Sequence, residues 1–416
     1  MTPAPRLHSL DTVRGVAVLG ILLLNIVSFA MPEAAYINPR AYGGWHGADL
    51  VAWAVNFILF DGKMRGLFSL LFGASMLLVI ERAAASGHSP ARTHYSRMAW
   101  LLVFGLAHLF LVWHGDILAH YAMIGALAFA FRNLPVPRLL ALGIVLVLLE
   151  ILVFSSIPAG VWMLEHLPPG SPHAAGLSGF QDSFGVPAPA VIAEQLARFR
   201  GDYAGIFEHR WVHNRLLPLQ LFLIFGPETL AYMCFGMAAL RSGMFRGEWP
   251  RVDLLRGMAV GFGIGIPAYA ALAAYIVSQD FALFPVTLAV MALATPVRPL
   301  MILGWVCLIL LLMRPGGPLT TRLAAAGRMA FTNYLATSLI CTFVFYGYGL
   351  GWYGYLPRAT LYLIVLAVWA LILLWSKPWL ARFRYGPLEW LWRSLACGKL
   401  QPMRYEGTAP AANVSH

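Results

Sequence analysis

Residues 13–31 read VRGVAVLGILLLNIVSFAM, an apolar run in which Arg14 is the one charged residue. A bilayer core of about 30 Å needs about 20 mostly apolar residues per helix, so this run predicts a transmembrane helix. Nine further stretches meet the same demand: 66–82, 97–114, 117–132, 138–157, 217–240, 255–277, 284–313, 328–346 and 359–376. The sequence therefore predicts an all-α, polytopic membrane bundle of about ten transmembrane helices.

The composition of the whole chain agrees with that prediction. Of 416 residues, 60% are hydrophobic and 11% are charged, and the mean hydropathy is +0.71. Soluble domains are roughly 45–50% apolar and about 25% charged, so a soluble enzyme is excluded. The four cysteines follow no metal-binding spacing and are expected to be small buried hydrophobes. A metal at His114, Asp116 and His120 is considered, but no second cluster supports it, and no metal is expected.

Three segments depart from a plain succession of spans. Residues 50–60 are apolar but short, which predicts an interfacial helix. The eighth stretch contains ATPVRP at 294–299, which predicts a kinked span or a re-entrant half followed by a span. Residues 158–216 form an outer loop with helical spacing over 189–213. We expect one membrane domain over 1–404 with this loop inside it, and a disordered tail over 405–416.

The net charge of +11 is interpreted through topology. Of the 29 Lys and Arg residues, 20 fall on the side of the bundle that holds both termini. Positively charged loops stay in the cytoplasm, so both termini are predicted to be cytoplasmic. The charge excess gives no reason to expect nucleic acid. A cleaved signal peptide over residues 6–30 is the alternative for the first span, but the apolar run is longer than signal peptides usually have.

Polar residues inside spans are costly, and they usually face a bundle interior or a wet cavity. Arg14 and Asn25 are eleven residues apart, which places them within about 20° of one helix face. His108 and Asp116 are eight residues apart, about 80° on a continuing helix, so both are expected to address one cavity. A buried histidine beside a carboxylate suits general acid–base chemistry. The alternatives are an Asp11–Arg14 surface pair and a histidine satisfied by a neighbouring helix.

Two further groups are candidate binding residues. Near the outer mouth, the candidates for an acceptor site are Tyr36, Asn38, His46, Asp49, Lys63 and Tyr121. The alternatives are an interfacial aromatic belt, favoured for Trp45 and Trp53, and a snorkelling Lys63. On the cytoplasmic side, the candidates for a phosphate-bearing cofactor site are Arg14, Arg328, Arg393, Asn333 and Tyr334. The alternative for each arginine is the positive-inside rule alone, and the helix around Glu389 and Trp390 is by default an interfacial anchor.

Several of these segments, in this order, resemble the YeiB family of bacterial inner-membrane proteins over nearly the whole chain. The resemblance is carried by residues 10–17 (LDTVRGVA) running into 20–25 (GILLLN), by 34–39 (AAYINP), 71–73 (LFG), His108 with 115–118 (GDIL), 327–334 (GRMAFTNY) and 386–393 (GPLEWLWR). The N-terminal part is also similar to transmembrane acyltransferases, of which heparan-alpha-glucosaminide N-acetyltransferase is the best known.

That second likeness implies an activity. Those acyltransferases take an acyl group from cytosolic acyl-CoA and deliver it across the membrane with the help of a histidine. In the lysosomal enzyme this histidine lies in the connection after the first span, where this chain has His46; the YeiB pattern does not require it. We therefore expect His108 with Asp116 to be the acid–base pair and His46 with Asp49 to be its rival. Asn25 or Lys63 is expected to stabilise the oxyanion.

The resemblance further implies acyl-CoA, such as acetyl-CoA, as the donor and a sugar or envelope glycan as the acceptor. The lipid bilayer is the other expected partner, and a homo-oligomer is left open. The competing hypothesis is transport of an ion, a small anion or a lipid-linked sugar. It draws on the broken eighth stretch and on the run GFGIGIP at 261–267, since discontinuous helices form mid-membrane sites in transporters. A scaffold for envelope assembly is a third hypothesis, which explains neither His108 nor Asp116.

Overall fold

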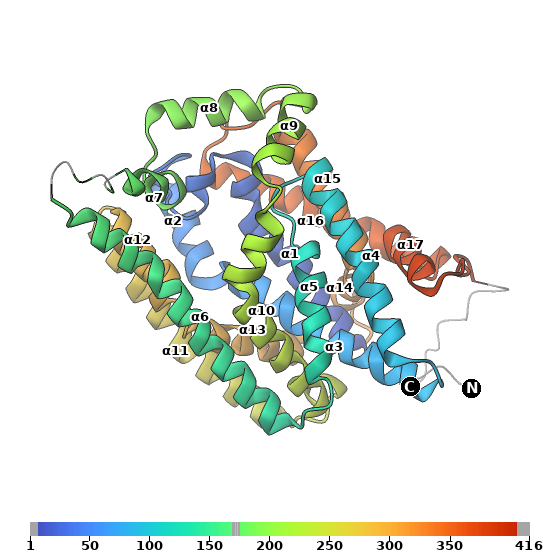
Figure 1. Ribbon diagram of the computed structural model, residues 1–416. Coiled ribbons are helices and arrows are strands. Elements are labelled where there is room, and N and C mark those ends of the chain that lie inside the picture. Colours follow the sequence, from blue (N-terminus) through green and yellow to red (C-terminus); the bar gives the residue numbers. More distant parts are fainter. Residues whose placement is uncertain (1–6, 169–170, 172, 174, 406–416) are drawn as a thin grey trace.

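The computed structural model describes residues 7–168, 171, 173 and 175–405, and these residues form a bundle of helices (Figure 1). The α-helices are α1 His8–Ala30, α2 Gly47–Val55, α3 Lys63–Ala85, α4 Pro90–Leu111, α5 Leu118–Ala128, α6 Val136–Glu165, α7 Gly176–Phe184, α8 Pro189–Phe199, α9 Tyr203–His213, α10 Leu217–Arg241, α11 Arg251–Ser278, α12 Leu283–Thr287, α13 Arg298–Leu312, α14 Pro318–Arg328, α15 Ala330–Phe345, α16 Arg358–Arg382 and α17 Pro387–Cys397. In the described part of the chain, β-structure is limited to one isolated bridge between Phe383 and Arg404.

Six helical segments in the described ranges are long and apolar enough to cross a membrane. They are α1, the run Gly47–Ala85, α6, α10, α11 and α16. The bent pair Leu283–Leu293 and Arg298–Leu312 makes a seventh when it is counted as one span. The predicted fourth and ninth spans correspond to shorter apolar helices, Leu118–Phe131 and Ala330–Phe345. The predicted third span lies in α4, whose first two turns carry Arg92, His94 and Arg97. The all-helical, membrane-type fold is thus confirmed.

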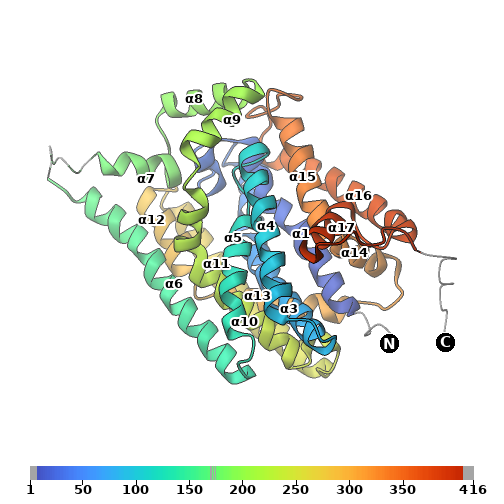
Figure 2. The same cartoon turned by 45° about the vertical axis from the view of Figure 1, so that its right-hand side comes forward.

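Helix α1 lies at the centre of the bundle. In its most apolar 18-residue window, 78% of the residues are buried, against 22% for α6 and 28% for both α11 and α16. Figures 1 and 2 show α6 and α11 together along one flank of the molecule. The exposed residues of α6 are large and apolar, among them Leu148 and Leu152, as expected for a helix that faces lipid.

One of the tightest crossings between helices joins α1 to α14. A Cβ atom added to Gly327 would lie 1.9 Å from the carbonyl oxygen of Asp11, and one added to Gly15 would lie 2.0 Å from that of Leu323. Both clashes involve backbone, so no side-chain rotation relieves them. Small residues at such crossings let helix backbones pack directly in membrane proteins. This contact fixes α14 against the N-terminal half of α1.

Replacing Gly327 with alanine is expected to lower the melting temperature of the purified protein in detergent, because α1 and α14 must separate to admit the methyl group. Overpacking of this kind costs about 1–3 kcal/mol or more. Gly179 in α7 is the matched control, since an added Cβ there meets nothing within 4 Å. The same melting temperature for Gly327→Ala and wild type would contradict the crossing described here.

The two predicted irregular segments have different outcomes. Residues 50–60 form α2 and a π-helical turn, and they are not interfacial: Trp53 is buried and stacks on Phe57 at 5.4 Å, against Tyr269 of α11. The aromatic-belt interpretation of Trp53 is therefore wrong, because its ring completes a core between helices. The predicted break in the eighth stretch is confirmed, with an angle of 59° between the two halves.

The outer loop forms three helices, α7, α8 and α9. The continuous helical spacing expected over 189–213 is interrupted at Arg200–Asp202, where the Asp202 carboxylate caps α9 by accepting from the Gly205 N–H at 2.9 Å. We call residues 189–213 the outer cap, which lies across one end of the bundle (Figures 1 and 2). Its rim is held by Arg200 Nε donating to the Tyr353 carbonyl and by the Tyr203 hydroxyl donating to the Leu111 carbonyl, each at 2.8 Å.

The connections rich in arginine meet at the opposite end, which we call the basic end. Arg241, at the end of α10, donates to the carbonyl of Arg132 at 2.6 Å and lies 3.9 Å from the Glu81 carboxylate at the end of α3. The Ser9 hydroxyl at the start of α1 donates to the Phe245 carbonyl. Three connections and the N-terminal end of α1, which the sequence assigned to one side, therefore lie together in space.

Candidate functional site

Two cavities in the described part of the bundle are lined by both charged and apolar residues. The inner cavity, of about 320 Å³, lies near the basic end and is lined by α1, α3, α4, α14, α15 and α17. The outer cavity, of about 300 Å³, lies toward the outer cap and is lined by α1, α3, α5, α10 and α13, together with the turn before α5. Helix α1 contributes to both, with Arg14 in the inner and Asn25 in the outer cavity. The predicted shared face of Arg14 and Asn25 thus runs from one cavity to the other.

Five arginines line the inner cavity. Arg14, Arg328 and Arg393, the three predicted to converge, come from α1, α14 and α17, and the structure adds Arg82 and Arg97. Arg14 is held by Asp11 at 2.9 Å and by the Ser75 hydroxyl at 2.6 Å. Arg82 and Arg97 could not be distinguished by sequence from the other arginines of the basic loops, because only the fold directs them toward this cavity.

Arg97 and Arg393 are the least compensated cations of the inner cavity. Arg97 lies over the Trp392 ring at 4.0 Å, and Arg393 lies over the Tyr385 ring at 4.8 Å. The two positive charges repel each other, and in the described ranges neither residue forms an ion pair. Guanidinium groups that face a cavity without carboxylate partners are suited to bind phosphate groups.

Glu389 fixes α17 as a wall of the inner cavity. Its carboxylate accepts from the N–H groups of Phe331 and Thr332 at 2.8 and 3.0 Å, which caps the start of α15. The Thr332 hydroxyl in turn accepts from the Leu388 N–H at 3.1 Å. Burial raises the pKa of Glu389 above its ordinary value, while these hydrogen bonds oppose the rise. Helix α17 is thus docked on the bundle as a wall of the inner cavity.

Two predicted cofactor residues lie outside the inner cavity. Asn333 is fully buried, and its amide donates to the Ala326 carbonyl at 3.0 Å and to the Ser376 hydroxyl at 3.2 Å. It joins α14, α15 and α16, so its role is in packing. Tyr334 accepts from the Ile117 N–H at 3.3 Å, and its ring lies 5.3 Å from the His108 ring. Tyr334 therefore lies between the two cavities.

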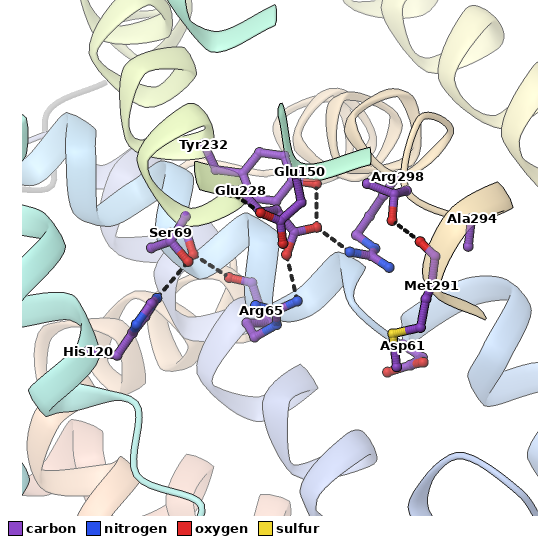
Figure 3. Close-up of polar contacts among 12 residues, drawn as sticks. Asp61, Arg65, Ser69, His120, Glu150, Glu228, Tyr232, Met291, Ala294 and Arg298 are labelled. Carbon is purple, nitrogen blue, oxygen red and sulfur yellow. Dashed lines mark hydrogen bonds and ion pairs between the residues drawn. The ribbon is translucent and has the colours of Figure 1, made fainter. Parts of the chain in front are cut away.

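A buried charge cluster, not predicted from the sequence, borders the outer cavity. Arg65 donates to Glu228 at 2.6 Å, and Arg298 donates to the other oxygen of the same carboxylate. Figure 3 shows both guanidinium groups directed at Glu228, with Glu150 beside it. The Glu150 carboxylate accepts from the Glu228 N–H at 3.3 Å. The available signal was the presence of Glu150 and Glu228 inside predicted spans, where acids are costly.

His108 and Asp116 form the predicted pair. His108 Nδ1 and Asp116 Oδ1 are 2.8 Å apart, and Asp116 Oδ2 accepts from the Ala119 N–H at 2.8 Å. They meet because α4 ends at Leu111 and the chain turns back before α5, not because one helix continues. Asp116 lines the outer cavity, and His108 lies behind it with Nε2 buried and without a partner.

The rival pair does not assemble. His46 is exposed and stacks on Trp45 at 3.8 Å. The Asp49 carboxylate instead accepts from the Ala359 N–H at 2.8 Å, at the start of α16. Neither residue lines a described cavity. Within the described residues, no carboxylate is hydrogen-bonded to the His46 ring to orient it.

The predicted acceptor residues divide into two groups. Tyr36 and Tyr121 line the outer cavity, where the Tyr36 hydroxyl donates to Asp61 at 3.2 Å. Asn38 is fully buried, and its amide donates to the carbonyls of Phe184 and Phe281 at 3.2 and 3.0 Å. Lys63 is also fully buried, with its ammonium over the Tyr269 ring at 3.1 Å. Asn38 and Lys63 therefore line neither of the two cavities, and both side chains make contacts inside the protein.

His120 is a further residue of the outer cavity that sequence reasoning weighed only as a metal ligand. Its Nε2 atom lies 2.8 Å from the Thr229 hydroxyl, and its Nδ1 atom is buried without a hydrogen-bond partner. The Thr229 contact fixes the orientation of the ring. Together with Asp61, Arg65 and Asp116, His120 gives this cavity groups that bind and orient a polar ligand.

The two cavities are separated by about one helical turn. On α3, Arg65 lines the outer cavity and Phe68 lines the inner one, which is a rise of about 4.5 Å. The Tyr121 ring stacks on Phe68 at 5.6 Å and lies 5.4 Å from Phe72. We call Phe68, Phe72, Tyr121, Tyr334 and His108 the partition. Four of its residues are phenylalanine or tyrosine, and the fifth is the imidazole of His108.

These features define a helical membrane-type protein with an arginine-rich cavity and a mixed-charge cavity on either side of a thin partition. The family profile described as "Protein of unknown function (DUF418)" matches residues 239–399. The chain is 33% identical over 398 residues to "Uncharacterized protein YeiB" of Escherichia coli (strain K12), covering 93% of this chain and 95% of that protein. It is 31% identical over 421 residues to "Uncharacterized protein YxaH" of Bacillus subtilis (strain 168), covering 96% of each. The chain therefore belongs to the YeiB family.

Proposed function

We propose that this protein is an integral membrane acyltransferase that moves an acetyl or similar acyl group from cytosolic acyl-CoA to an extracytoplasmic acceptor such as a sugar or envelope glycan. The observation that carries the proposal is the position of His108, whose free Nε2 lies in a partition between an arginine-rich cavity and an outer cavity with polar groups. The donor binds on one side of this partition and the acceptor on the other.

The proposal includes a topology. The chain crosses the bacterial inner membrane ten times, with α4, α5 and α15 as spans in addition to the longer helices. Both termini are cytoplasmic. The support is the basic end, where arginine-rich connections gather next to the inner cavity, as the positive-inside rule expects. Acyl-CoA, which is made in the cytosol, then has direct access to the inner cavity.

Donor binding uses the uncompensated arginines. The pyrophosphate and 3′-phosphate of coenzyme A match the guanidinium groups of Arg97 and Arg393, with Arg14 and Arg328 on the neighbouring walls. Phe68, Phe72 and Phe331 line the same cavity and provide apolar surface for the pantetheine arm. The thioester at the end of that arm then reaches the partition.

In the reaction, neutral His108 takes the proton from the acceptor hydroxyl or amine at Nε2 while the acceptor attacks the thioester carbonyl. The new acyl bond forms, the carbon–sulfur bond breaks, and the coenzyme A thiolate leaves and receives the proton. Asp116, 2.8 Å from Nδ1, orients the ring and stabilises the imidazolium. Asn25 and Arg65 line the outer cavity with Asp116 and supply donors for the oxyanion.

The test is the binding of acetyl-CoA to the full-length protein in detergent, measured by isothermal titration calorimetry. We expect micromolar affinity. The double variant Arg97→Gln, Arg393→Gln is expected to bind at least tenfold more weakly, since a hydrogen bond to a charged group contributes about 1.5–3 kcal/mol. Arg256→Gln is the control, because Arg256 is an exposed arginine of α11 paired with Asp253. Absence of acetyl-CoA binding to the wild type would overturn the proposal.

Transport of a small anion or a lipid-linked substrate is the second candidate. It is favoured by the break between η5 (Leu288–Leu293) and α13, which puts Arg298 at the start of a half-helix and on the wall of the outer cavity. Flux into proteoliposomes in the absence of coenzyme A would support transport. Release of free thiol from acetyl-CoA would support acyl transfer.

A further inference from the structure

Arg210, on α9 of the outer cap, is a buried cation that contacts the Tyr203 ring at 5.8 Å but has no hydrogen-bond partner among the described residues. Its side chain is 1% exposed, and Nε, Nη1 and Nη2 all lack a hydrogen-bond partner. Among the described residues it forms no ion pair. An arginine near lipid normally extends its guanidinium toward water. Arg210 instead directs its guanidinium into the protein.

The surroundings of Arg210 offer donors and aromatic rings. The titratable groups that act most strongly on it are Tyr346, Tyr203 and Tyr348. Tyr346 is 1% exposed, and its hydroxyl also lacks a partner. Trp113, which lines the outer cavity, is buried with an unpaired indole N–H. Several hydrogen-bond donors under the outer cap are thus unsatisfied, and no carboxylate pairs with the guanidinium.

His114, Glu33 and His209 are other charged or titratable groups near this cluster, and His209 in turn adjoins Arg198 and His213. The positive charge of Arg210 and the negative charge of Glu33 act in opposite directions on His114. Glu33 is exposed, and it holds the outer cap through its backbone N–H, which donates to Gln195 at 3.0 Å. Its carboxylate therefore does not compensate Arg210.

A guanidinium stays charged at every physiological pH, so burial cannot neutralise it, and an unpaired buried charge carries a large desolvation penalty. We propose that Arg210 and the Tyr346 hydroxyl bind an oxyanion between the outer cap and the bundle. The ligand group is a carboxylate, phosphate or sulfate that reaches the protein from the extracytoplasmic side. This inference is independent of the proposed acyl transfer, because none of its residues lines the inner cavity.

Two hydrogen bonds of the outer cap hold it over the proposed site. Phe199 accepts from the Gly347 N–H at 2.9 Å, next to Tyr346, and Arg200 is bonded to Tyr353. These contacts hold the end of α8, and with it the connection to α9, against the bundle. An oxyanion bound to Arg210 would link α9 to the end of α15 and so stabilise the closed cap.

The experiment measures thermal unfolding of the full-length protein in detergent. The background is the variant Arg97→Gln, Arg393→Gln, which removes the anion site of the inner cavity. Sodium phosphate is titrated against sodium chloride at matched ionic strength, and a second arm adds phosphatidylglycerol or phosphatidylcholine to the micelles. We expect a saturable rise in melting temperature with phosphate, or with phosphatidylglycerol but not phosphatidylcholine. The first result assigns a soluble oxyanion and the second a lipid headgroup.

Arg210→Met in the same background is expected to abolish the rise, and Tyr346→Phe is expected to weaken the apparent affinity several-fold. Arg215→Met, at an exposed arginine just after the outer cap, is the control and is expected to keep the rise. Should Arg210→Met fail to fold, the phosphate or lipid titration of Tyr346→Phe decides. The proposal is overturned when neither phosphate nor phosphatidylglycerol raises the melting temperature, or when the rise is the same in the Arg210 and Tyr346 variants as in the background.

Discussion

Replacing His108 with alanine is expected to abolish release of free thiol from acetyl-CoA. A general base contributes about 10²–10⁴-fold to a rate, so the turnover at saturating donor and acceptor is expected to fall by that factor. The physical reason is that His108 is the base of the partition and that its Nε2 atom is free while Asp116 holds Nδ1. The measurement follows free thiol with a chromogenic thiol reagent in detergent, with mixed glycans as acceptors.

His46→Ala is the matched histidine control and is expected to retain the wild-type rate, because His46 is exposed and far from any carboxylate partner. Asp116→Asn is expected to lower the rate while keeping the pair hydrogen-bonded. Gel filtration of each variant shows whether it is folded. A folded His108→Ala protein that turns over at the wild-type rate would exclude His108 as the base, and loss of activity in His46→Ala would reinstate the rival assignment.

Replacing Glu228 with alanine is expected to cause the largest loss of stability. Glu228 is buried and binds Arg65 and Arg298 at once, so its removal leaves two guanidinium groups facing each other beside the outer cavity. Breaking a buried ion pair by removing one partner costs about 3–5 kcal/mol. We expect a large drop in the melting temperature of the detergent-solubilised protein and a low yield from membranes.

Two variants bracket this expectation. Glu228→Gln keeps one carbonyl acceptor and is expected to lose less stability than Glu228→Ala. Glu194→Gln breaks an exposed i,i+4 pair with Arg198 and is expected to change little, since surface pairs contribute about 0–1 kcal/mol. If the Glu228→Ala protein had the same melting temperature as the Glu194→Gln variant, this would show that Arg65 and Arg298 find other partners or water.

The parts of the molecule that the sequence predicted well are those set by the membrane. The apolar run over 13–31 lies in the central helix, because the length of an apolar run is a local property of the sequence. The prolines on either side of Arg298 coincide with the break in the eighth stretch, because each proline lacks a backbone donor. The pair of His108 and Asp116 was also found from proximity in sequence. Its geometry differs from the expected helix, since the turn after Leu111 brings the two side chains together.

The parts that sequence reasoning missed depend on contacts between distant segments. Asn38 and Asn333 look like site residues because amides are rare in apolar surroundings, yet each donates to partners that no local pattern identifies. Arg65, Glu228 and Arg298 come from three helices, and their charges balance only once these helices pack. A polar residue in a span is thus a reliable sign of a buried interaction, but the partner decides whether the interaction serves packing or binding.

The cap that Glu389 provides to α15 has a mechanical consequence. Helix α17 carries Trp392 and Arg393 on the wall of the inner cavity, and α15 carries Tyr334 against the ring of His108. The Glu389 carboxylate joins α17 to the start of α15, so the two helices are expected to move together. One end of this unit lines the inner cavity, and the other carries Tyr334 beside His108. If the proposed reaction is right, occupancy of the inner cavity and alignment of His108 are linked, and by reciprocity an acceptor that orders His108 strengthens donor binding in the inner cavity.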